Sequence, residues 1–246
     1  MTHRWLHLRL AAPLMAFGGV KVDHVGPTRE FPSASALTGL LANALGWRRE
    51  DASLHQKLQD RMVFGALSAI PEERIAPLSV TDSQNARLYD GEPAWTVIGV
   101  VETRNKSQSY SNSPEPTQHG NQMGRKWMTH RLSRDYLADH EIHVVLRLDR
   151  DGAPTLDDVS IALDRPVRPL FIGRKSCLPA GRLFAGWVEG ADAFAALRAL
   201  GLKGRALWAD DAPPRHGVLR HALPDLRNWS TGLHAGSRIV NEGEIA

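Results

Sequence analysis

The feature that most constrains the fold of this chain is the alternation of short apolar strands with amphipathic helices. Residues 5–10, Trp-Leu-His-Leu-Arg-Leu, alternate apolar and polar side chains, which is typical of a half-buried strand. A Pro- and Gly-rich connection follows over residues 11–32. A stripe of Leu and Ala at helical spacing then runs from Leu37 to Leu45, and Gly46 ends it. The chain therefore begins as a strand, a long loop and a helix.

The same alternation continues to about residue 200. We expect a second helix over 51–60, strands over 62–67, 75–80, 95–102, 142–148 and 183–188, and helices over 155–163 and 191–200. This order suits an α+β domain of split βαβ type. The sheet of such a domain leaves a face or an edge open to single-stranded nucleic acid.

Two segments depart from this pattern. Residues 105–124 contain Met123 as their only aliphatic side chain, so they cannot bury a core face and we expect a mobile excursion there. The tail from Lys203 onward is polar and rich in turn residues.

Composition limits the classes of protein to consider. The single cysteine, Cys177, excludes an internal disulfide framework and fits a reducing cytoplasm. The sequence lacks an apolar run long enough to span a membrane and a signal-peptide-like start. The net charge is +3 and the isoelectric point about 9.2, so a nucleic-acid-binding protein of this composition needs clustered cations. Such clusters occur at 125–134 and 165–182.

The second cluster contains the most informative segment, Arg168-Pro-Leu-Phe-Ile-Gly-Arg-Lys-Ser-Cys177. Residues 170–172 predict a buried strand, and Gly173 would let the backbone come close to a ligand. The run Arg174-Lys175-Ser176 then offers charged and neutral donors to an anion. Between Arg165 and Arg182 there are five Lys or Arg and no Asp or Glu. The pattern predicts contact with a phosphate backbone, and a solvated loop is the alternative.

Three blocks of sequence resemble a known family. They are Phe31–Gly46, Arg134–Asp139 and Arg168–Cys177, in that order, and Pro13–Gly18 also matches the start of the family. Together they resemble the CasD family of CRISPR-associated proteins, the RAMP-fold subunit that caps the 5′ end of the guide RNA (crRNA) in the type I-E Cascade complex. The resemblance covers most of residues 4–200.

This resemblance implies a fold, a function and partners. The fold would be a ferredoxin-like (RRM-like) RAMP core over residues 1–202, with an inserted β-hairpin thumb at about 75–130 and a less regular C-terminal tail, 203–246, packed on the core. The function would be that of a non-catalytic, cytoplasmic crRNA-binding subunit without a cofactor, supporting RNA-guided binding of foreign DNA in antiviral defence. Its partners would be the crRNA 5′ handle, the Cascade backbone subunits, the Cascade large subunit and, in the assembled complex, target DNA, with no membrane.

The residues that we expect at the RNA are cations, hydroxyl groups and one aromatic ring, most of them near turns: Phe17, Lys21, Arg29, Ser33, Ser35, Arg125, Lys126, Arg131, Arg174, Lys175 and Ser176. Phe17, beside two glycines, would either stack on a base or anchor its loop in the core. Ser33 or Ser35 would begin a helix whose first N–H groups favour a phosphate, or would only cap it.

The first basic cluster has its own alternatives. Arg125, Lys126 and Arg131 lie in a stretch without acids, and we expect a loop there that orders on an RNA backbone. A soluble insertion that binds nothing is the other interpretation of this stretch.

Two other functions compete with the binding subunit. A metal-independent endoribonuclease of the same fold, processing pre-crRNA, would use His119, Lys126, His130 and Tyr136 as its acids and bases. A generic RNA-binding protein unconnected to any complex is the third hypothesis. Zinc-type ligand spacing, P-loops and dinucleotide fingerprints are absent from the sequence, so we expect no metal site and no nucleotide hydrolysis.

Overall fold

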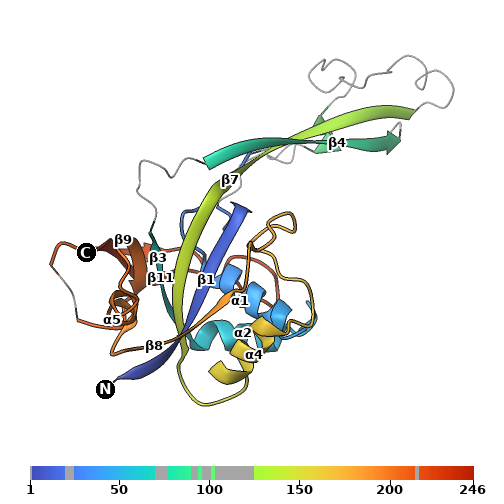
Figure 1. The fold of residues 1–246 in the computed structure, drawn as a ribbon. Coiled ribbons are helices and arrows are strands. Elements are labelled where there is room, and N and C mark those ends of the chain that lie inside the picture. The colour runs from blue at the N-terminus through green and yellow to red at the C-terminus, as the bar shows by residue number, and fades with distance from the viewer. Residues whose placement is uncertain are drawn as a thin grey trace. The chain divides into compact units, whose positions relative to one another are not determined.

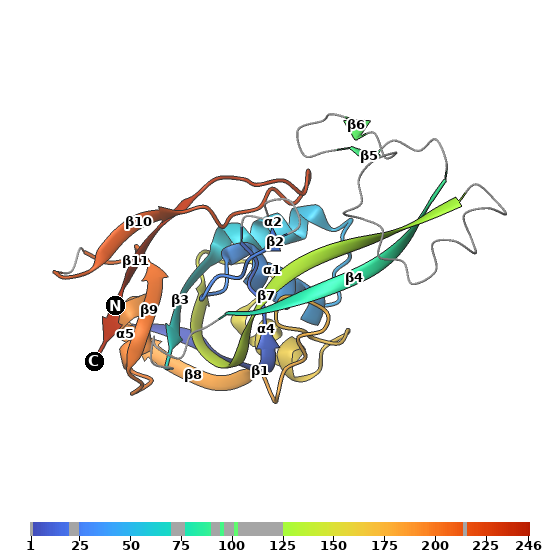
Figure 2. The same cartoon turned by 90° about the horizontal axis from the view of Figure 1, so that it is seen from above.

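The computed structural model describes residues 2–19, 25–69, 77–89, 94–95, 101–102, 125–213 and 216–246. These residues group into two compact units, a core of residues 1–18, 28–78 and 136–246 and a second unit of residues 19–27 and 79–135. The elements, labelled in Figure 1 or Figure 2, are β1 (His3–Met15), β2 (Val25–Gly26), α1 (Ala34–Ala44), α2 (Ala52–Arg61), β3 (Met62–Ser68), β4 (Pro77–Tyr89), β5 (Ala94–Trp95), β6 (Val101–Glu102), β7 (Arg125–Leu148), α4 (Leu156–Asp164), β8 (Phe184–Gly190), α5 (Ala193–Arg198), β9 (Gly204–Ala209), β10 (Leu219–Leu223) and β11 (Arg238–Ile245). Within this described part of the chain, no helix is both long enough and apolar enough to cross a membrane.

The core is built on an antiparallel sheet. Its strand order is β10-β11-β9-β3-β7-β1-β8, and each neighbouring pair runs antiparallel. The strand β7 lies between β1 and β3, with Val144 opposite Leu8 of β1 on one side and opposite Ala66 of β3 on the other. Mixed α and β structure was predicted from the sequence and is confirmed.

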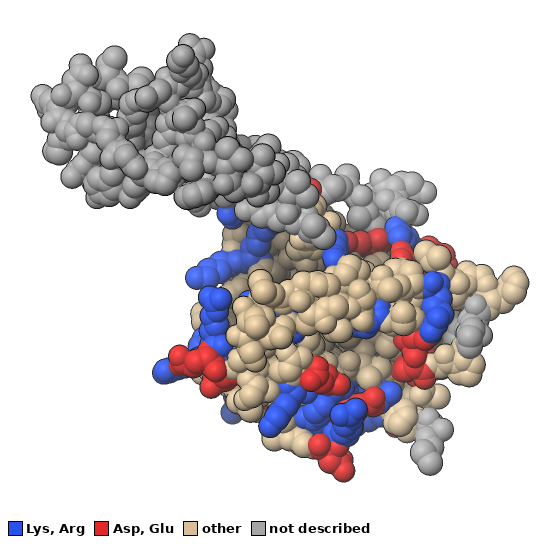
Figure 3. Space-filling model, turned by 180° about the vertical axis from the view of Figure 1, so that it is seen from behind, with Lys and Arg blue, Asp and Glu red and all other residues tan. Residues whose placement is uncertain are grey.

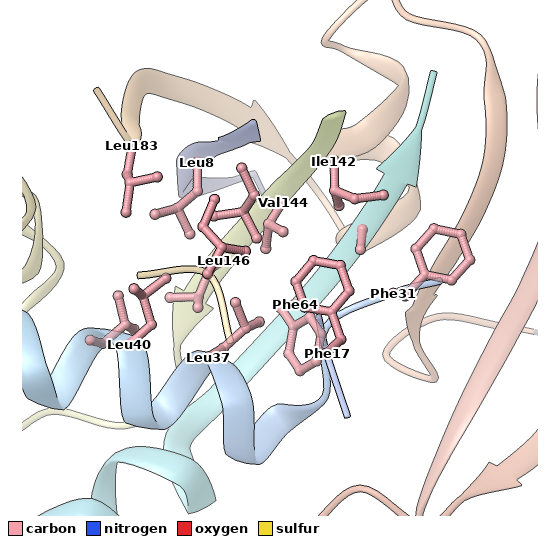
Figure 4. Packing of buried hydrophobic residues seen from close by; sticks show 14 of the residues in the cluster. Leu8, Phe17, Phe31, Leu37, Leu40, Phe64, Ile142, Val144, Leu146 and Leu183 are labelled. Carbon is pink, nitrogen blue, oxygen red and sulfur yellow. The ribbon is translucent and has the colours of Figure 1, made fainter. Parts of the chain in front are cut away.

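Helices cover both faces of this sheet. On one face, Leu6, Leu8 and Leu10 of β1 enter a buried cluster to which α1, α2 and α4 contribute (Figure 4). On the other face, Trp5 packs with Leu197 of α5 in a second cluster. The alternation of residues 5–10 arises because successive side chains of a strand point to opposite faces. Burial of these apolar side chains is the main contribution to the stability of the core.

The helix α1 forms where the leucine stripe predicted it. The hydroxyl of Ser33 accepts a hydrogen bond from the Ala36 N–H at 3.1 Å and caps the helix. Leu37 and Leu41 are buried beneath it. The helix ends before Gly46, whose φ of +80° is a left-handed conformation that glycine adopts without strain.

A carboxylate from the C-terminal segment completes this cap. Oδ2 of Asp225 accepts the N–H of Ala34 at 3.0 Å, and the Asp225 carbonyl accepts the N–H of Ser35 at 3.2 Å. The same buried carboxylate accepts hydrogen bonds from Nε of Arg238 at 3.0 and 3.1 Å. A negative charge at a helix N-terminus is favourable because the first N–H groups and the helix dipole are positive there.

The part of the C-terminal segment between β10 and β11 lies along α2 (Figure 2). The side-chain amide of Gln59 forms two hydrogen bonds with the backbone of Arg227. It donates to the Arg227 carbonyl at 2.9 Å and accepts from the Arg227 N–H at 3.2 Å. Trp229 stacks on the ring of His55 with 4.7 Å between ring centroids. The segment from Lys203 onward is thus more regular than its composition indicated, since it forms three strands of the sheet and a loop fixed to a helix.

The second unit contains residues of β2, β4, β5 and β6 and the first part of β7, up to Asp135. The strand β4 pairs with β7, and Val25 of β2 lies opposite Ser133 in a parallel bridge. The single strand predicted over residues 95–102 is wrong: β5 and β6 pair with each other in antiparallel fashion, with Trp95 opposite Val101. Residues 103–124, which contain the whole of the predicted mobile excursion, lie outside the described residues.

Asp225→Ala tests the cap. We expect the free energy of unfolding to fall by about 3–5 kcal/mol, because the change leaves the Arg238 guanidinium buried without its counter-charge. Urea denaturation of the purified chain measures this loss. In the control Glu50→Ala, which removes an exposed partner of Arg48, the change should be within about 0.5 kcal/mol. Equal effects of the two substitutions would contradict the role given to Asp225.

Candidate nucleic-acid interface

The segment 170–177 is a closed loop attached to the end of β1. Ile172 donates its N–H to the Cys177 carbonyl at 2.7 Å, and Cys177 donates its N–H to the Arg174 carbonyl at 2.9 Å. The Ala16 N–H donates to the Ile172 carbonyl at 3.3 Å. The strand predicted over 170–172 is therefore wrong: Ile172 is buried, as an apolar residue should be, but the chain turns back on itself within five residues.

Gly173 is required by a close approach inside the protein. Its φ is +92°, and a Cβ at this position would lie 1.6 Å from the carbonyl oxygen of Ala16. The sequence led us to expect that this glycine lets the backbone approach a ligand. In the structure, Gly173 lies against the backbone of Ala16 instead. The absence of a side chain therefore allows the loop to pack against the end of β1.

The loop presents its polar residues outward from a buried base. Cys177 is 1% exposed and packs with Ala16 and Tyr136, as predicted for a small buried residue. The guanidinium carbon of Arg174 lies 4.6 Å from the centre of the Tyr136 ring, a cation–π contact that orients the side chain. Lys175 and the following Ser176 are exposed. One cation oriented by an aromatic ring, beside a second exposed cation, suits the binding of phosphates.

Two other cations of this cluster have partners within the core. Arg168 donates to the carbonyls of Trp47 at 2.9 Å and Gly46 at 3.0 Å, and so closes the C-terminal end of α1. Arg182 forms a bidentate ion pair with Asp164. That pair borders an open groove of about 520 Å³, whose wall also includes Leu163, Pro166, Leu170 and Pro179. Arg168 and Arg182 therefore have structural roles, whereas Arg174 and Lys175 stand at the surface of the loop.

Phe17 lies in the core rather than at the surface. Its side chain is 6% exposed and packs with Phe31 and Leu37 in the cluster shown in Figure 4. Its N–H donates to the hydroxyl of Thr28 at 3.1 Å. This position matches the second interpretation of Phe17, in which the ring anchors its loop in the core. Stacking on a base would require the ring to leave the cluster.

The N-terminus of α1 already has an internal anion. Ser33 caps the helix, and its hydroxyl lies 3.1 Å from that of Ser35. The carboxylate of Asp225 takes the place in which a phosphate was expected. Arg29 donates to the Pro224 carbonyl at 3.0 Å, in the same C-terminal segment. RNA contact by these three residues stays a prediction, and each of them has a partner in the protein.

The structure describes the remaining predicted residues only in part. Arg125, Lys126 and Arg131 belong to β7, so the loop expected there is a strand. Their side chains, Lys21 and the possible catalytic residue His119 lie outside the described residues. Tyr136, another candidate for acid–base chemistry, is 8% exposed beneath Arg174.

A polar chain of four side chains crosses β1 and β7 and was not predicted. Nε2 of His7 lies 3.0 Å from Nδ1 of His143, whose Nε2 lies 3.0 Å from Oε1 of Glu141, and Arg9 holds Glu141 in a bidentate pair at 2.7 Å. Burial, with a smaller effect of His143, lowers the pKa of His7 to about 4. Burial also lowers the pKa of His143. Both rings are therefore neutral at pH 7 and add no positive charge for a phosphate.

The sequence contained only a weak signal for this polar chain of four side chains. His7 and Arg9 are the polar positions of the first alternating strand, and His143 interrupts an apolar one, yet only the strand register shows that they meet. Among the residues that the structure describes, no three His, Cys, Asp or Glu side chains are grouped to hold a metal ion.

Comparisons with known proteins agree with this fold. The sequence is 26% identical over 212 residues to the CRISPR system Cascade subunit CasD of Escherichia coli (strain K12), covering 86% of this chain and 84% of that protein. The fold is similar to a chain of a CRISPR RNA-guided surveillance complex, with a TM-score of 0.57, 17% identity and coverage of 98% and 89% of the two chains. It is also similar to the crystal structure of a Cas protein, with a TM-score of 0.54, 19% identity and coverage of 99% and 94%.

The antiparallel sheet with helices on both faces is thus a fold found in CRISPR-associated proteins. The match to the family described as CRISPR-associated protein (Cas_Cas5) extends over residues 5–241. The chain belongs to this family, which confirms the relationship predicted from the three sequence blocks.

Gly173→Ala tests the seat of the loop. We expect a loss of about 2 kcal/mol or more in the free energy of unfolding, because the new Cβ meets the Ala16 carbonyl and the φ of +92° is unfavourable for alanine. Gly181→Ala is the matched control in the same segment, since its Cβ has nothing within 4 Å. The denaturation midpoints of the two variants are compared with that of the unchanged chain. An unchanged midpoint for Gly173→Ala would show that the loop does not pack against Ala16 as described.

Proposed function

We propose that this chain is a non-catalytic, cytoplasmic crRNA-binding subunit of a type I-E Cascade complex that holds the 5′ handle of the guide RNA. Membership of the CRISPR-associated family and similarity to a Cascade subunit support this role. In the assembled complex its partners are the backbone subunits, the large subunit and target DNA, and its function is to support RNA-guided binding of foreign DNA in antiviral defence. Pairing with the guide RNA, rather than this chain, reads the sequence of the target.

The observation that carries the proposal is the loop 172–177. Gly173 and Cys177 fix its backbone, and the Tyr136 ring orients Arg174 beside the exposed Lys175. A fixed backbone is important because a loop that is already ordered loses little entropy when it binds. Two cations at such a loop can each neutralise a phosphate of the handle.

The connectivity of the core supports the finer description of the fold as ferredoxin-like. Along the chain the core runs β1, α1, β3, β7, α4, β8, which is a βαββαβ order. In the sheet these four strands lie in the order β3-β7-β1-β8. Numbered along the chain they are 2-3-1-4, the arrangement of the split βαβ fold. The strands β9, β10 and β11 and the helix α5 extend this core.

The second unit supplies the proposed thumb. It contains β4 paired with β7, two long strands of the kind from which a hairpin is built. We infer that this unit separates guide bases, with Arg125, Lys126 and Arg131 of β7 on the RNA backbone. Unpaired bases of the handle would be read by stacking and at their edges.

The double variant Arg174→Ala, Lys175→Ala tests the loop. We expect weaker binding of a guide RNA and a salt dependence of log K that is shallower by about 1.4, which corresponds to two lost phosphate contacts on a single strand. Binding is measured by fluorescence anisotropy over a series of salt concentrations.

Arg182→Ala is the matched control, because it removes a cation of the same cluster that is paired with Asp164. Its salt slope should remain that of the unchanged chain. A double variant with unchanged affinity and unchanged slope would remove Arg174 and Lys175 from the site.

A further inference from the structure

Two arginine side chains converge on a turn of the C-terminal segment. Gly232 has a φ of +77°, and a Cβ built on it would lie 3.2 Å from Nη2 of Arg227 and 3.9 Å from Nη2 of Arg49. Arg49 comes from the turn after α1, and Arg227 is 178 residues away in sequence. Because Gly232 carries no side chain, both guanidinium groups come close to its backbone, and we call this arrangement of Arg49, Arg227 and the Gly232 backbone the notch.

The turn that forms this notch is well ordered by hydrogen bonds. Asn228 donates its N–H to the Leu233 carbonyl at 2.9 Å, and its own carbonyl accepts the N–H of Gly232 at 2.8 Å. Its side-chain Oδ1 accepts the N–H groups of Ser230 and Thr231, each at 3.0 Å. The notch therefore has a backbone fixed before any ligand arrives.

Packing also restrains Arg227. Its backbone N–H and carbonyl are both hydrogen-bonded to the Gln59 amide of α2. Its guanidinium carbon lies 5.0 Å from the centre of the Trp229 ring, whose indole N–H donates to Gln59 at 3.1 Å. A guanidinium held in this way loses little freedom when it binds an anion.

Neither guanidinium of this pair has a paired carboxylate among the residues that the structure describes. In the part of the chain that the structure describes, no carboxylate forms an ion pair with Arg49 or Arg227, whereas the adjacent Arg48 pairs with Glu50 at 3.4 Å. Figure 3 shows blue and red side chains lying side by side in this way at several places on one face of the molecule.

A buried donor in the same group has no acceptor. Nε of Arg227 is inaccessible to solvent and has no hydrogen-bond partner. Buried donors are nearly always paired, so the unpaired Nε leaves the Arg227 guanidinium with unused hydrogen-bonding capacity. An anion that accepts from one guanidinium and attracts the other would satisfy both observations.

We propose that Arg49, Arg227 and the Gly232 turn form a phosphate-binding notch. A phosphate group has the charge and the several acceptor oxygens that two guanidinium groups can share. The notch is separate from the loop 172–177 and supplies a second contact for a nucleic-acid backbone. The choice of a nucleic acid as the source of the phosphate rests on the proposed function, whereas the affinity for the phosphate group does not.

Inorganic phosphate tests the notch without RNA. The Nε–H of Arg227 is shielded from solvent, so its proton should exchange slowly enough to give a resolved ¹⁵N-correlated NMR signal. Titration with sodium phosphate should shift this signal saturably, whereas sodium chloride at matched ionic strength should not. Arg49→Gln should weaken the effect several-fold, and Arg48→Gln should leave it unchanged. The absence of a phosphate-specific shift would overturn the proposal.

A single-stranded guide RNA tests the source of the phosphate. Arg49→Gln should make the slope of log K against log salt shallower by about 0.7, the value for one phosphate contact, while Arg48→Gln keeps the original slope. Equal slopes for these two variants would exclude the nucleic acid as the source. If the unchanged chain binds no guide RNA, the proposed function fails, and the phosphate titration still decides whether the notch exists.

Discussion

The structure depends on the buried pair of Asp225 and Arg238 at the N-terminus of α1. The carboxylate joins the last part of the chain to the first helix of the core, and the Arg238 guanidinium lies 4.1 Å from the centre of the Phe64 ring on β3. A buried charge is costly without its counter-charge and hydrogen bonds, so the helix, the strand and the C-terminal segment stabilise one another through this pair.

The effect of this pair extends to the candidate RNA-binding loop through α1. The far end of the helix exposes the carbonyls of Gly46 and Trp47, and Arg168 binds both. Arg168 begins the segment whose next residues form the loop on the end of β1. Both proposed anion sites therefore depend on one helix, since Arg49 follows its C-terminal end and the turn at Gly232 is held by the segment that caps its N-terminal end.

The sequence predicted most helices and strands of the core because their apolar periods record which face is buried. Leu37 and Leu41 specify α1 in this way, and Ser33 marks its first turn. The closed loop at Gly173 and the position of Asp225 were not predictable. Each depends on a contact between residues far apart in sequence, and a glycine or an aspartate carries no local sign of its distant partner. The same reason explains why the phosphate expected at Ser33 is replaced by an internal carboxylate.

Sequence composition was also limited in predicting which cations are available to bind a phosphate. Composition identified the cluster 165–182, but it did not separate Arg168 and Arg182, which have internal partners, from Lys175, which is exposed. Nor did it single out Arg49 and Arg227, which lie outside both basic clusters of the sequence. Charge density along a chain thus locates a binding segment approximately, whereas the pairing of each cation decides which of them can meet a phosphate.

The most direct test of the central claim is nuclease footprinting of an end-labelled guide RNA bound to this chain, with a parallel incubation in chelator. The account predicts protection of the repeat-derived nucleotides at the 5′ end, loss of that protection in the Arg174→Ala, Lys175→Ala variant, and an RNA that stays intact in chelator. Protection spread evenly along the RNA, or cleavage within the repeat, would contradict it.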